Sequence, residues 1–548
     1  MYNYAIKSNF EGDLSMSKKI LAVMLSVVMA FSIFCVPVAA CVQIESANIE
    51  NLFYMSVDTL IHRILTVLNI FWPGYDGDWD TLDEYKAKNF YAGESEFDKN
   101  VTADSEWSLG YAGASLLEGL DIMNGEYFLA GSLEVFEGRV PQKINDDQRV
   151  RVYAISDGVS GIAVQAVIDG FGLSRGDVQT IRARVEEAVK SEEYNIISLD
   201  VSVLHQHSCI DTLGMNIPLL SGLIINTSNA ALGGLLDKFK VLKNQQFMEN
   251  LFDTTTDCVV SAIENMETGD LYYGYTNIKE YMRDARDPWS FDENIHRLRF
   301  VPDDGSKETW ILQGSMHCTG MGAGPDELTA DYPYYIEKAI NEKANANVVY
   351  VIGAELAIRQ ERELTDKEDA TDIENIEAYG YALADKVMKI KNDIKLQPVL
   401  NVAHKEVYLN VDNGILTLAA REDILNAIIV KDGFKYVMIT EIGYMELGNQ
   451  VGIFMCPGEF DPMLIFGGPE SGEAAWKGDS WDYAPAKDFT DAEYIMVYGL
   501  CNDQAGYVLR DNEYHSLIGE NEEVNILSRT AGATFVTAFE ELLDSVNN

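Results

Sequence analysis

Basic residues are scarce in this chain. Its 548 residues include 41 Lys and Arg against 87 Asp and Glu, which gives a formal net charge of −46 at pH 7. Nucleic-acid binding needs clustered Lys and Arg against the phosphates, and an anionic membrane surface repels a protein of this charge. The composition therefore argues against both partners, and the acidity is interpreted as an aid to solubility.

Cysteine is also sparse, with seven residues, and their spacing forms neither a disulfide framework nor a CxxC zinc knuckle. Two of the seven, Cys35 and Cys41, fall in the N-terminal export segment described below. The remaining number is odd, so at least one thiol is expected to be free. These five are Cys209, Cys258, Cys318, Cys456 and Cys501.

Long apolar runs are limited to one N-terminal stretch. Lys18 and Lys19 precede the run Ile20–Phe34, and Val38–Ala40 precedes Cys41. A basic start, a short apolar run and a small-residue cleavage site are typical of a signal peptide, here residues 1–41, and the run is short for a membrane span. The same ending resembles a bacterial lipobox. Two outcomes stay open: cleavage with release, or a membrane tether through a lipid on Cys41. Either one predicts an extracytoplasmic protein.

From residue 107 to 548 there is no linker, low-complexity tract or repeat, and strand patterns alternate with helix patterns. This alternation predicts one large α/β domain, with a mixed, mostly buried sheet flanked by helices, behind a stalk segment at 42–106. The expected strands are Gly161–Asp169, Ile196–Leu204, Thr309–Leu312, Val348–Ile352, Lys435–Thr440, Gly452–Met455 and Tyr494–Leu500. The expected helices are Asp177–Lys190, Tyr332–Ala344 and Glu377–Lys391.

Histidine is rare, with seven residues, so the pair His205 and His207 is informative. Residues two apart on a strand share a face, which is the spacing that two metal ligands on one strand require. His317, Glu459 and Tyr507 likewise each follow a strand pattern in a Gly-containing loop. Open α/β sheets bind ligands at the carboxyl ends of their strands, and His with a carboxylate is a common zinc donor set. Nearby thiols could also bind zinc, but small buried residues in tight loops are the favoured interpretation.

These segments resemble the catalytic domain of neutral ceramidases, the zinc-dependent amidases of the neutral/alkaline non-lysosomal type. Each motif is moderately specific, and their order over roughly 107–540 is the stronger signal. The matching segments are Arg151–Gly158, Ile181–Arg184, His205–Ile210, His317–Thr319, Leu328–Asp331, Pro457–Phe460 and Asn502–Tyr507.

The resemblance implies a zinc ion bound by His205, His317, Glu459 and Tyr507. His207 would face the scissile carbonyl, stabilise the oxyanion and donate a proton to the leaving amine, while zinc activates water. The implied activity is hydrolysis of an N-acyl amide in a small ceramide-like lipid; no protein partner is predicted.

The chain departs from the family pattern after Gly353–Glu355, where Leu356–Gln360 replaces Gly-Asp-Val-Ser-Pro. The family's functional Ser is missing, and Arg359 stands at its register, so Arg359 is the candidate for a catalytic role there. A different interpretation is a non-catalytic surface protein that retains the fold.

A competing motif is Gly172–Gly176, which matches GxSxG between a strand and a helix and would make Ser174 the nucleophile of a serine esterase. Ser174 and Asp177 also form the Ser-x-x-Asp pair of a helix N-cap. Capping is the favoured interpretation.

Overall fold

The computed structural model describes residues 79–131, 138–214, 244–286, 288–321, 326–361, 371–414, 416–417, 425–433, 435–469, 480–514 and 525–547. The expected signal peptide lies outside these residues. Within them, no helix has both the length and the apolarity that crossing a membrane requires.

The larger of two main sheets has nine strands in mixed orientation. Only two residue pairs join β1 to β6, and β11 at one end of the strand order contacts β5 at the other, so the sheet folds over on itself. A large apolar core combines residues from both halves of this sheet with residues from neighbouring helices and from the second sheet. The strand order is β11 (Asn347–Ile352), β9 (Thr309–Gly314), β8 (Asn294–Pro302), β6 (Glu267–Asn277), β1 (Ser108–Ser115), β3 (Arg149–Ser156), β4 (Ile162–Ile168) and β5 (Ile196–Val203), with β13 (Ile394–Lys395) paired to β6.

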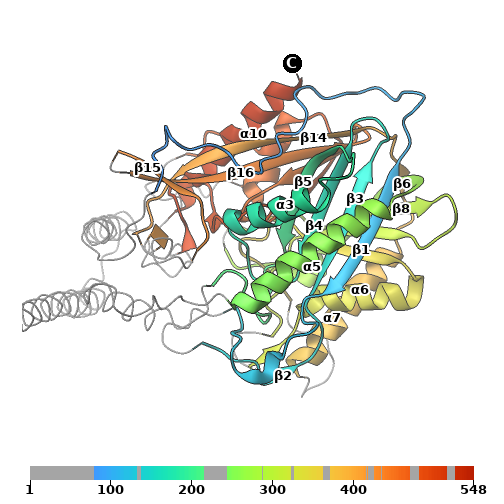
Figure 1. The fold of residues 1–548 in the computed structure, drawn as a ribbon, viewed down its shortest axis with the longest axis horizontal. Coiled ribbons are helices and arrows are strands. Elements are labelled where there is room, and N and C mark those ends of the chain that lie inside the picture. The colour runs from blue at the N-terminus through green and yellow to red at the C-terminus, as the bar shows by residue number, and fades with distance from the viewer. Residues whose placement is uncertain are drawn as a thin grey trace, which may run out of the picture.

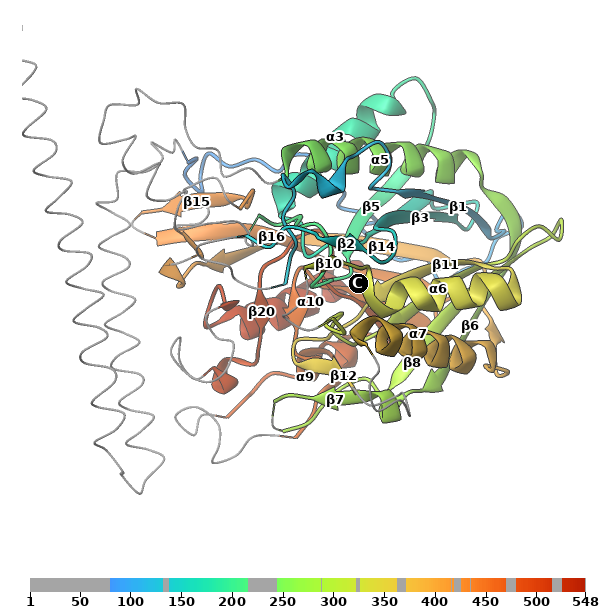
Figure 2. The same ribbon diagram turned by 90° about the horizontal axis from the view of Figure 1, so that it is seen from below.

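Helices cover the outer faces of this folded sheet. Helices α3 (Arg175–Ala188) and α5 (Gln245–Glu264) pack over the half that contains β1, β3 and β4. Helices α6 (Asp331–Ala344) and α7 (Asp372–Met388) cover the other half, on the opposite side of the molecule (Figures 1 and 2).

The second sheet has five strands and is covered by α10 (Ala531–Asn547), which contacts β14 and β16 (Figure 1). Its strand order is β14 (Leu400–Asn410), β16 (Lys435–Leu447), β17 (Val451–Met455) and β19 (Tyr494–Tyr498), with β15 (Ile429–Asp432) paired to β16. Two-stranded ladders fill the gaps: β18 (Glu459–Phe460) with β20 (Tyr507–Val508), β12 (Ile358–Gln360) with β7 (Met282–Asp284), and β10 (Glu327–Leu328) with β2 (Lys143–Ile144).

The predicted α/β class with mixed, helix-flanked sheet is confirmed. The alternation of patterns did not predict the division of the strands between two large sheets. One boundary matters for function: β5 ends at Val203, so the HxH pair lies beyond the strand. The division into a stalk at 42–106 and a domain at 107–548 stays a prediction.

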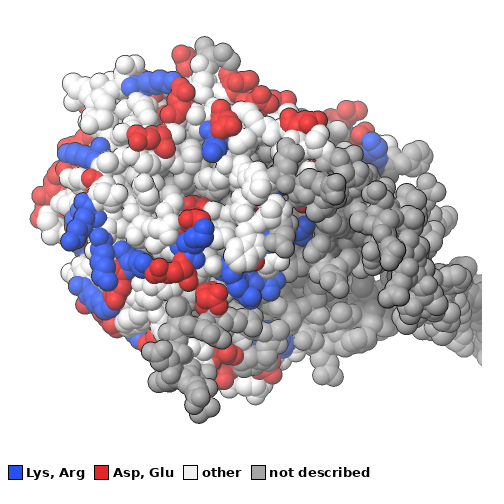
Figure 3. Space-filling model, turned by 180° about the vertical axis from the view of Figure 1, so that it is seen from behind, with Lys and Arg blue, Asp and Glu red and all other residues white. Residues whose placement is uncertain are grey.

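The charged side chains on one face of the molecule are drawn in Figure 3. On the face seen in Figure 3, Lys and Arg lie among Asp and Glu and form no continuous basic area.

Candidate metal centre

Three imidazoles meet where β5 and β9 end. His205 has a φ of 52°, a strained conformation for a non-glycine residue, which turns the chain out of β5. The turn pairs with the loop after β9, because Gln206 forms a parallel bridge with Cys318 and the His207 amide donates to the Cys318 carbonyl at 3.1 Å. His207 and His317 thereby come within 4.6 and 5.0 Å of the His205 ring, centre to centre. The prediction that strand alternation places His205 and His207 on one face is therefore wrong, although the two rings do converge.

Each of the three imidazoles faces a backbone carbonyl with Nδ1. Such a carbonyl can only accept, so each Nδ1 carries a proton and Nε2 is the nitrogen left to bind a cation. The contacts are His205 to Phe171 O at 2.8 Å, His207 to Gly131 O at 3.2 Å, and His317 to Glu355 O at 2.9 Å.

Gly131 is needed for the second of these contacts. Its φ is 104°, and a Cβ there would meet the His207 carbonyl at 1.9 Å. A side chain at this position would therefore push His207 away.

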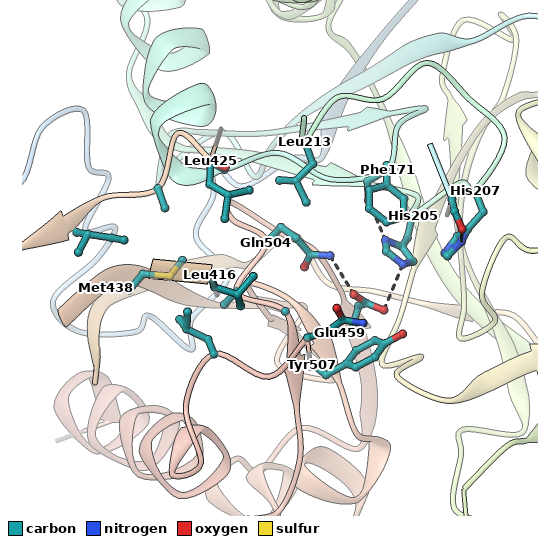
Figure 4. Close-up of a pocket in the computed structure, with 18 residues that line it drawn as sticks. Phe171, His205, His207, Leu213, Leu416, Leu425, Met438, Glu459, Gln504 and Tyr507 are labelled. Atoms are coloured by element: carbon teal, nitrogen blue, oxygen red, sulfur yellow. Dashed lines mark hydrogen bonds and ion pairs between the residues drawn. The ribbon is translucent and has the colours of Figure 1, made fainter. Parts of the chain in front are cut away.

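Glu459 and Tyr507 are brought to the imidazoles by backbone register. They are direct partners in the parallel ladder β18–β20, so their side chains emerge on one face. Glu459 Oε2 lies 3.2 Å from His205 Nε2 and 3.1 Å from His317 Nε2. Tyr507 lies beside this carboxylate, with its hydroxyl toward the histidines (Figure 4). Gln504 Nε2 donates to the other oxygen, Oε1, at 3.0 Å.

Charges in the centre are strongly coupled. Burial alone would raise the pKa of Glu459, but His205 and His317 outweigh it and hold that pKa well below its usual value. Burial would lower the pKa of His317, but Glu355 and Glu459 outweigh it and raise that pKa well above its usual value. Burial, with His205 and His317 adding to it, lowers the pKa of His207. His207 is therefore neutral.

This donor set fits a divalent cation. Zn–N and Zn–O bonds of 2.0–2.1 Å in a tetrahedron separate ligand atoms by about 3.3 Å, close to the two Glu459 distances. The ligand nitrogens of His205, His207 and His317 all lie within 4.8 Å of one another. His207 Nε2 is buried with no hydrogen-bond partner among the described residues, an orphan that a cation or its water would satisfy. Imidazole and carboxylate donors of this kind suit zinc.

Two residues of the centre, Glu355 and Gln504, were not predicted. Glu355 is fully buried, and its Oε2 lies 2.5 Å from His317 Nδ1. It directly follows the strand β11 in Gly353-Ala354-Glu355, so the rule that selected His317 and Glu459 would also have selected it. Gln504 lies in the loop before Tyr507, but an amide gives no comparable signal.

Arg359 and Ser174 differ in their position relative to the cavity. Arg359 is on β12, opposite Arg283, and does not line the cavity described below. Ser174 is the N-cap of α3, where the Asp177 carboxylate accepts from its backbone N–H at 3.2 Å. It lines the cavity, but among the described residues it has no hydrogen bond to a histidine. The structure thus shows the capping arrangement at the GxSxG motif.

The five thiols are free and buried. Burial raises the pKa of Cys209, Cys318, Cys456 and Cys501, and within the described ranges none of them belongs to a cluster of metal-ligating groups. They therefore behave as small apolar residues of tight loops.

A cavity of about 220 Å³ opens from the centre, lined by His205, His207, Glu459 and Tyr507. Away from these residues its walls are largely apolar (Figure 4), and the part of the chain that the structure describes contributes no Lys or Arg to them. The apolar lining consists of Phe171, Leu213, Leu416, Leu425, Ala427, Ile429, Met438, Ala505 and Leu527.

No protein-family model matches the chain, and a search of curated proteins finds no relative. Solved structures do match. Neutral ceramidase from Pseudomonas aeruginosa superposes with a TM-score of 0.60 at 14% identity, over 81% of this chain and 76% of that one. A structure described as ceramidase complexed with C2 gives 0.58 at 14%, with the same coverage. The chain has the neutral-ceramidase fold. The expected resemblance is thereby confirmed at the level of the fold.

Proposed function

We propose that this protein is an exported, zinc-dependent amidohydrolase that cleaves an N-acyl amide bond in ceramide-like lipids. The observation that carries the proposal is the convergence of His205, His317 and Glu459, with Tyr507 beside them, at one end of an apolar cavity. Ligands on separate loops and an adjacent apolar wall are what hydrolysis of a lipid amide requires.

In this proposal His205, His317, Glu459 and Tyr507 hold the ion. Bound zinc polarises the amide carbonyl and supplies a nucleophilic water near neutral pH. His207 starts neutral with Nε2 unprotonated, so this atom accepts the proton of the attacking water and then delivers it to the leaving amine nitrogen. Gln504 keeps Glu459 oriented. The absent Ser takes no part, and the position of Arg359 outside the cavity lining supports no step for it.

The substrate class follows from the cavity lining. Among the described residues that line it, Glu459 is the one charged side chain besides the imidazoles, so a carboxylate or phosphate next to the scissile bond would find no counter-ion among them. We infer a neutral N-acyl amide whose hydrocarbon tail packs on the leucines and Met438. Export by the signal peptide, with or without a lipid on Cys41, would place the enzyme where such lipids are exposed.

The test measures zinc content of the purified chain together with hydrolysis of a panel of neutral and anionic N-acyl lipids, with and without a chelator. We expect about one zinc per chain and chelator-sensitive cleavage of neutral amides. The matched control is His296→Gln, because His296 is buried but bonds to Tyr273 and Asp292 away from the centre. Stoichiometric zinc without turnover on any amide would favour the non-catalytic surface protein instead.

A further inference from the structure

Glu355 places a fully buried carboxylate next to the candidate metal centre. Its side chain has no exposed surface, and neither carboxylate oxygen has a well-directed hydrogen-bond donor among the described residues. A buried, unpaired carboxylate costs several kcal/mol, so an ionised Glu355 requires positive charge nearby.

His317 is the group that pairs with this carboxylate. Glu355 Oε2 lies 2.5 Å from His317 Nδ1, and the Glu355 backbone carbonyl lies 2.9 Å from the same atom in better hydrogen-bond geometry. One residue thus offers two acceptors to one N–H. The ring is held so that Nε2, its other nitrogen, faces Glu459 at 3.1 Å.

The position of Glu355 differs from that of the proposed metal ligands. It approaches the nitrogen of His317 that points away from Glu459, and it does not line the cavity. Its carboxylate nevertheless lies close to that of Glu459, since the ligand atoms of Glu355, His317 and Glu459 are all within 4.8 Å. Two carboxylates this close repel each other unless a cation lies between or beside them. When both are ionised they carry two negative charges, which a divalent ion would balance.

We propose that Glu355 is a positioning residue, whose carboxylate orients His317 and increases its basicity toward the divalent cation; this rests on the proposed function. A carboxylate on the distal nitrogen of a His ligand fixes the tautomer and strengthens the ligand. The short loop after β11 therefore supplies a charge to the centre, immediately before the segment where the sequence departs from the ceramidase pattern.

The experiment compares Glu355→Gln and Glu355→Asp with the unsubstituted chain. Zinc affinity is measured by competition with a chromophoric chelator, and the visible absorption spectrum of the cobalt-loaded protein reports ligand geometry. We expect Glu355→Gln to keep one metal per chain, weaken affinity by about 10–100-fold and shift the cobalt bands. Glu355→Asp retains the charge and should recover part of the affinity.

The matched control is Glu446→Gln, because Glu446 is a buried carboxylate on β16 whose partner is the Tyr444 hydroxyl, at 3.2 Å. It should change neither affinity nor spectrum. Unchanged affinity and spectrum in Glu355→Gln would overturn the positioning role. Complete loss of metal, as expected for Glu459→Gln, would also overturn it, because Glu355 would then be a ligand. Failure of the unsubstituted chain to bind zinc would instead overturn the proposed function first.

Discussion

Two buried clusters of charged side chains lie on either side of the loop 502–504. They differ in how the negative charge of their carboxylates is balanced. In the metal centre, Glu355 and Glu459 form ion pairs only with histidines among the described residues. In the second group, here called the arginine cluster, three carboxylates meet two arginines and a histidine. Its members are Arg175 and Arg182 of α3, Asp200 of β5, His404 and Glu406 of β14, and Glu441 of β16.

The difference indicates that the candidate metal centre, and not the arginine cluster, requires an added cation. Glu441 lies 2.6 Å from Arg182 and 3.2 Å from Arg175, so its charge is compensated by permanent cations. Glu459 has only titratable imidazoles, with Nε2 atoms available for a metal. The loop joins the two, because Asn502 donates to Asp200 and Gln504 donates to Glu459. We infer that the arginine cluster holds the loop in place and that the candidate metal centre is suited to a cation.

The largest expected effect comes from Glu459→Gln. It removes the carboxylate shared by His205 and His317, so zinc affinity and amide hydrolysis should both fall by at least about 10³-fold, a change of about 4 kcal/mol. Equilibrium dialysis with metal analysis and turnover assays measure the two losses. Retention of stoichiometric zinc by Glu459→Gln would contradict the difference proposed between the two clusters.

Glu441→Gln should instead destabilise the fold. Removing one partner of a buried ion pair leaves uncompensated charge and costs about 3–5 kcal/mol. Denaturant unfolding followed by circular dichroism measures the loss, and the protein that remains folded should still bind one zinc per chain. A Glu441→Gln variant as stable as the unsubstituted chain would show that this cluster does not hold the fold.

Chelation should lower the stability of the unsubstituted chain. A ligand that binds only the folded state contributes about 2.7 kcal/mol at 100 times its dissociation constant. The midpoint of thermal unfolding should therefore drop on removal of zinc and return when zinc is restored. In Glu459→Gln the midpoint should not respond to chelator, and a response there would place the stabilising metal elsewhere.

A smaller effect is the pH dependence of the stability contributed by two buried aspartates, which has opposite sign for each. The pKa of Asp503 is raised by burial to about 7, so its stabilising contribution is present below the unfolded value of 3.8 and lost as pH rises through 7. Burial would raise the pKa of Asp200, but His404 and Arg182 outweigh it and lower it to about 2. The Asp200 contribution is therefore present above pH 3.8 and lost as pH falls through 2.

Unfolding free energies of Asp503→Asn between pH 4 and 8 test this sign. The unsubstituted chain should lose stability relative to the variant as pH rises, while the exposed Asp257→Asn serves as the control. Parallel curves for Asp503→Asn and the unsubstituted chain would contradict the assignment.

Sequence patterns predicted most elements because each element carries its own periodicity. The helix expected at Tyr332–Ala344 is observed as α6, Asp331–Ala344, and the strand expected at Gly452–Met455 as β17, Val451–Met455. The site depended on contacts between distant segments. The pairing of Glu459 with Tyr507 in β18–β20 is a tertiary register that no local pattern contains. The φ of 52° at His205, which replaces strand alternation, is likewise imposed by the bridge to Cys318.

The smallest expected effect tests whether Ser174 is the N-cap of a helix or a catalytic nucleophile. Ser174→Ala removes the N-cap of α3, the helix that carries both arginines of the arginine cluster, and should cost about 0.5–2 kcal/mol of stability. Because the proposed chemistry takes place at the metal centre, zinc content and turnover of the folded fraction should stay unchanged. Loss of turnover with full zinc occupancy, together with labelling of Ser174 by a fluorophosphonate, would reverse the comparison and move the chemistry from the histidines to the start of α3.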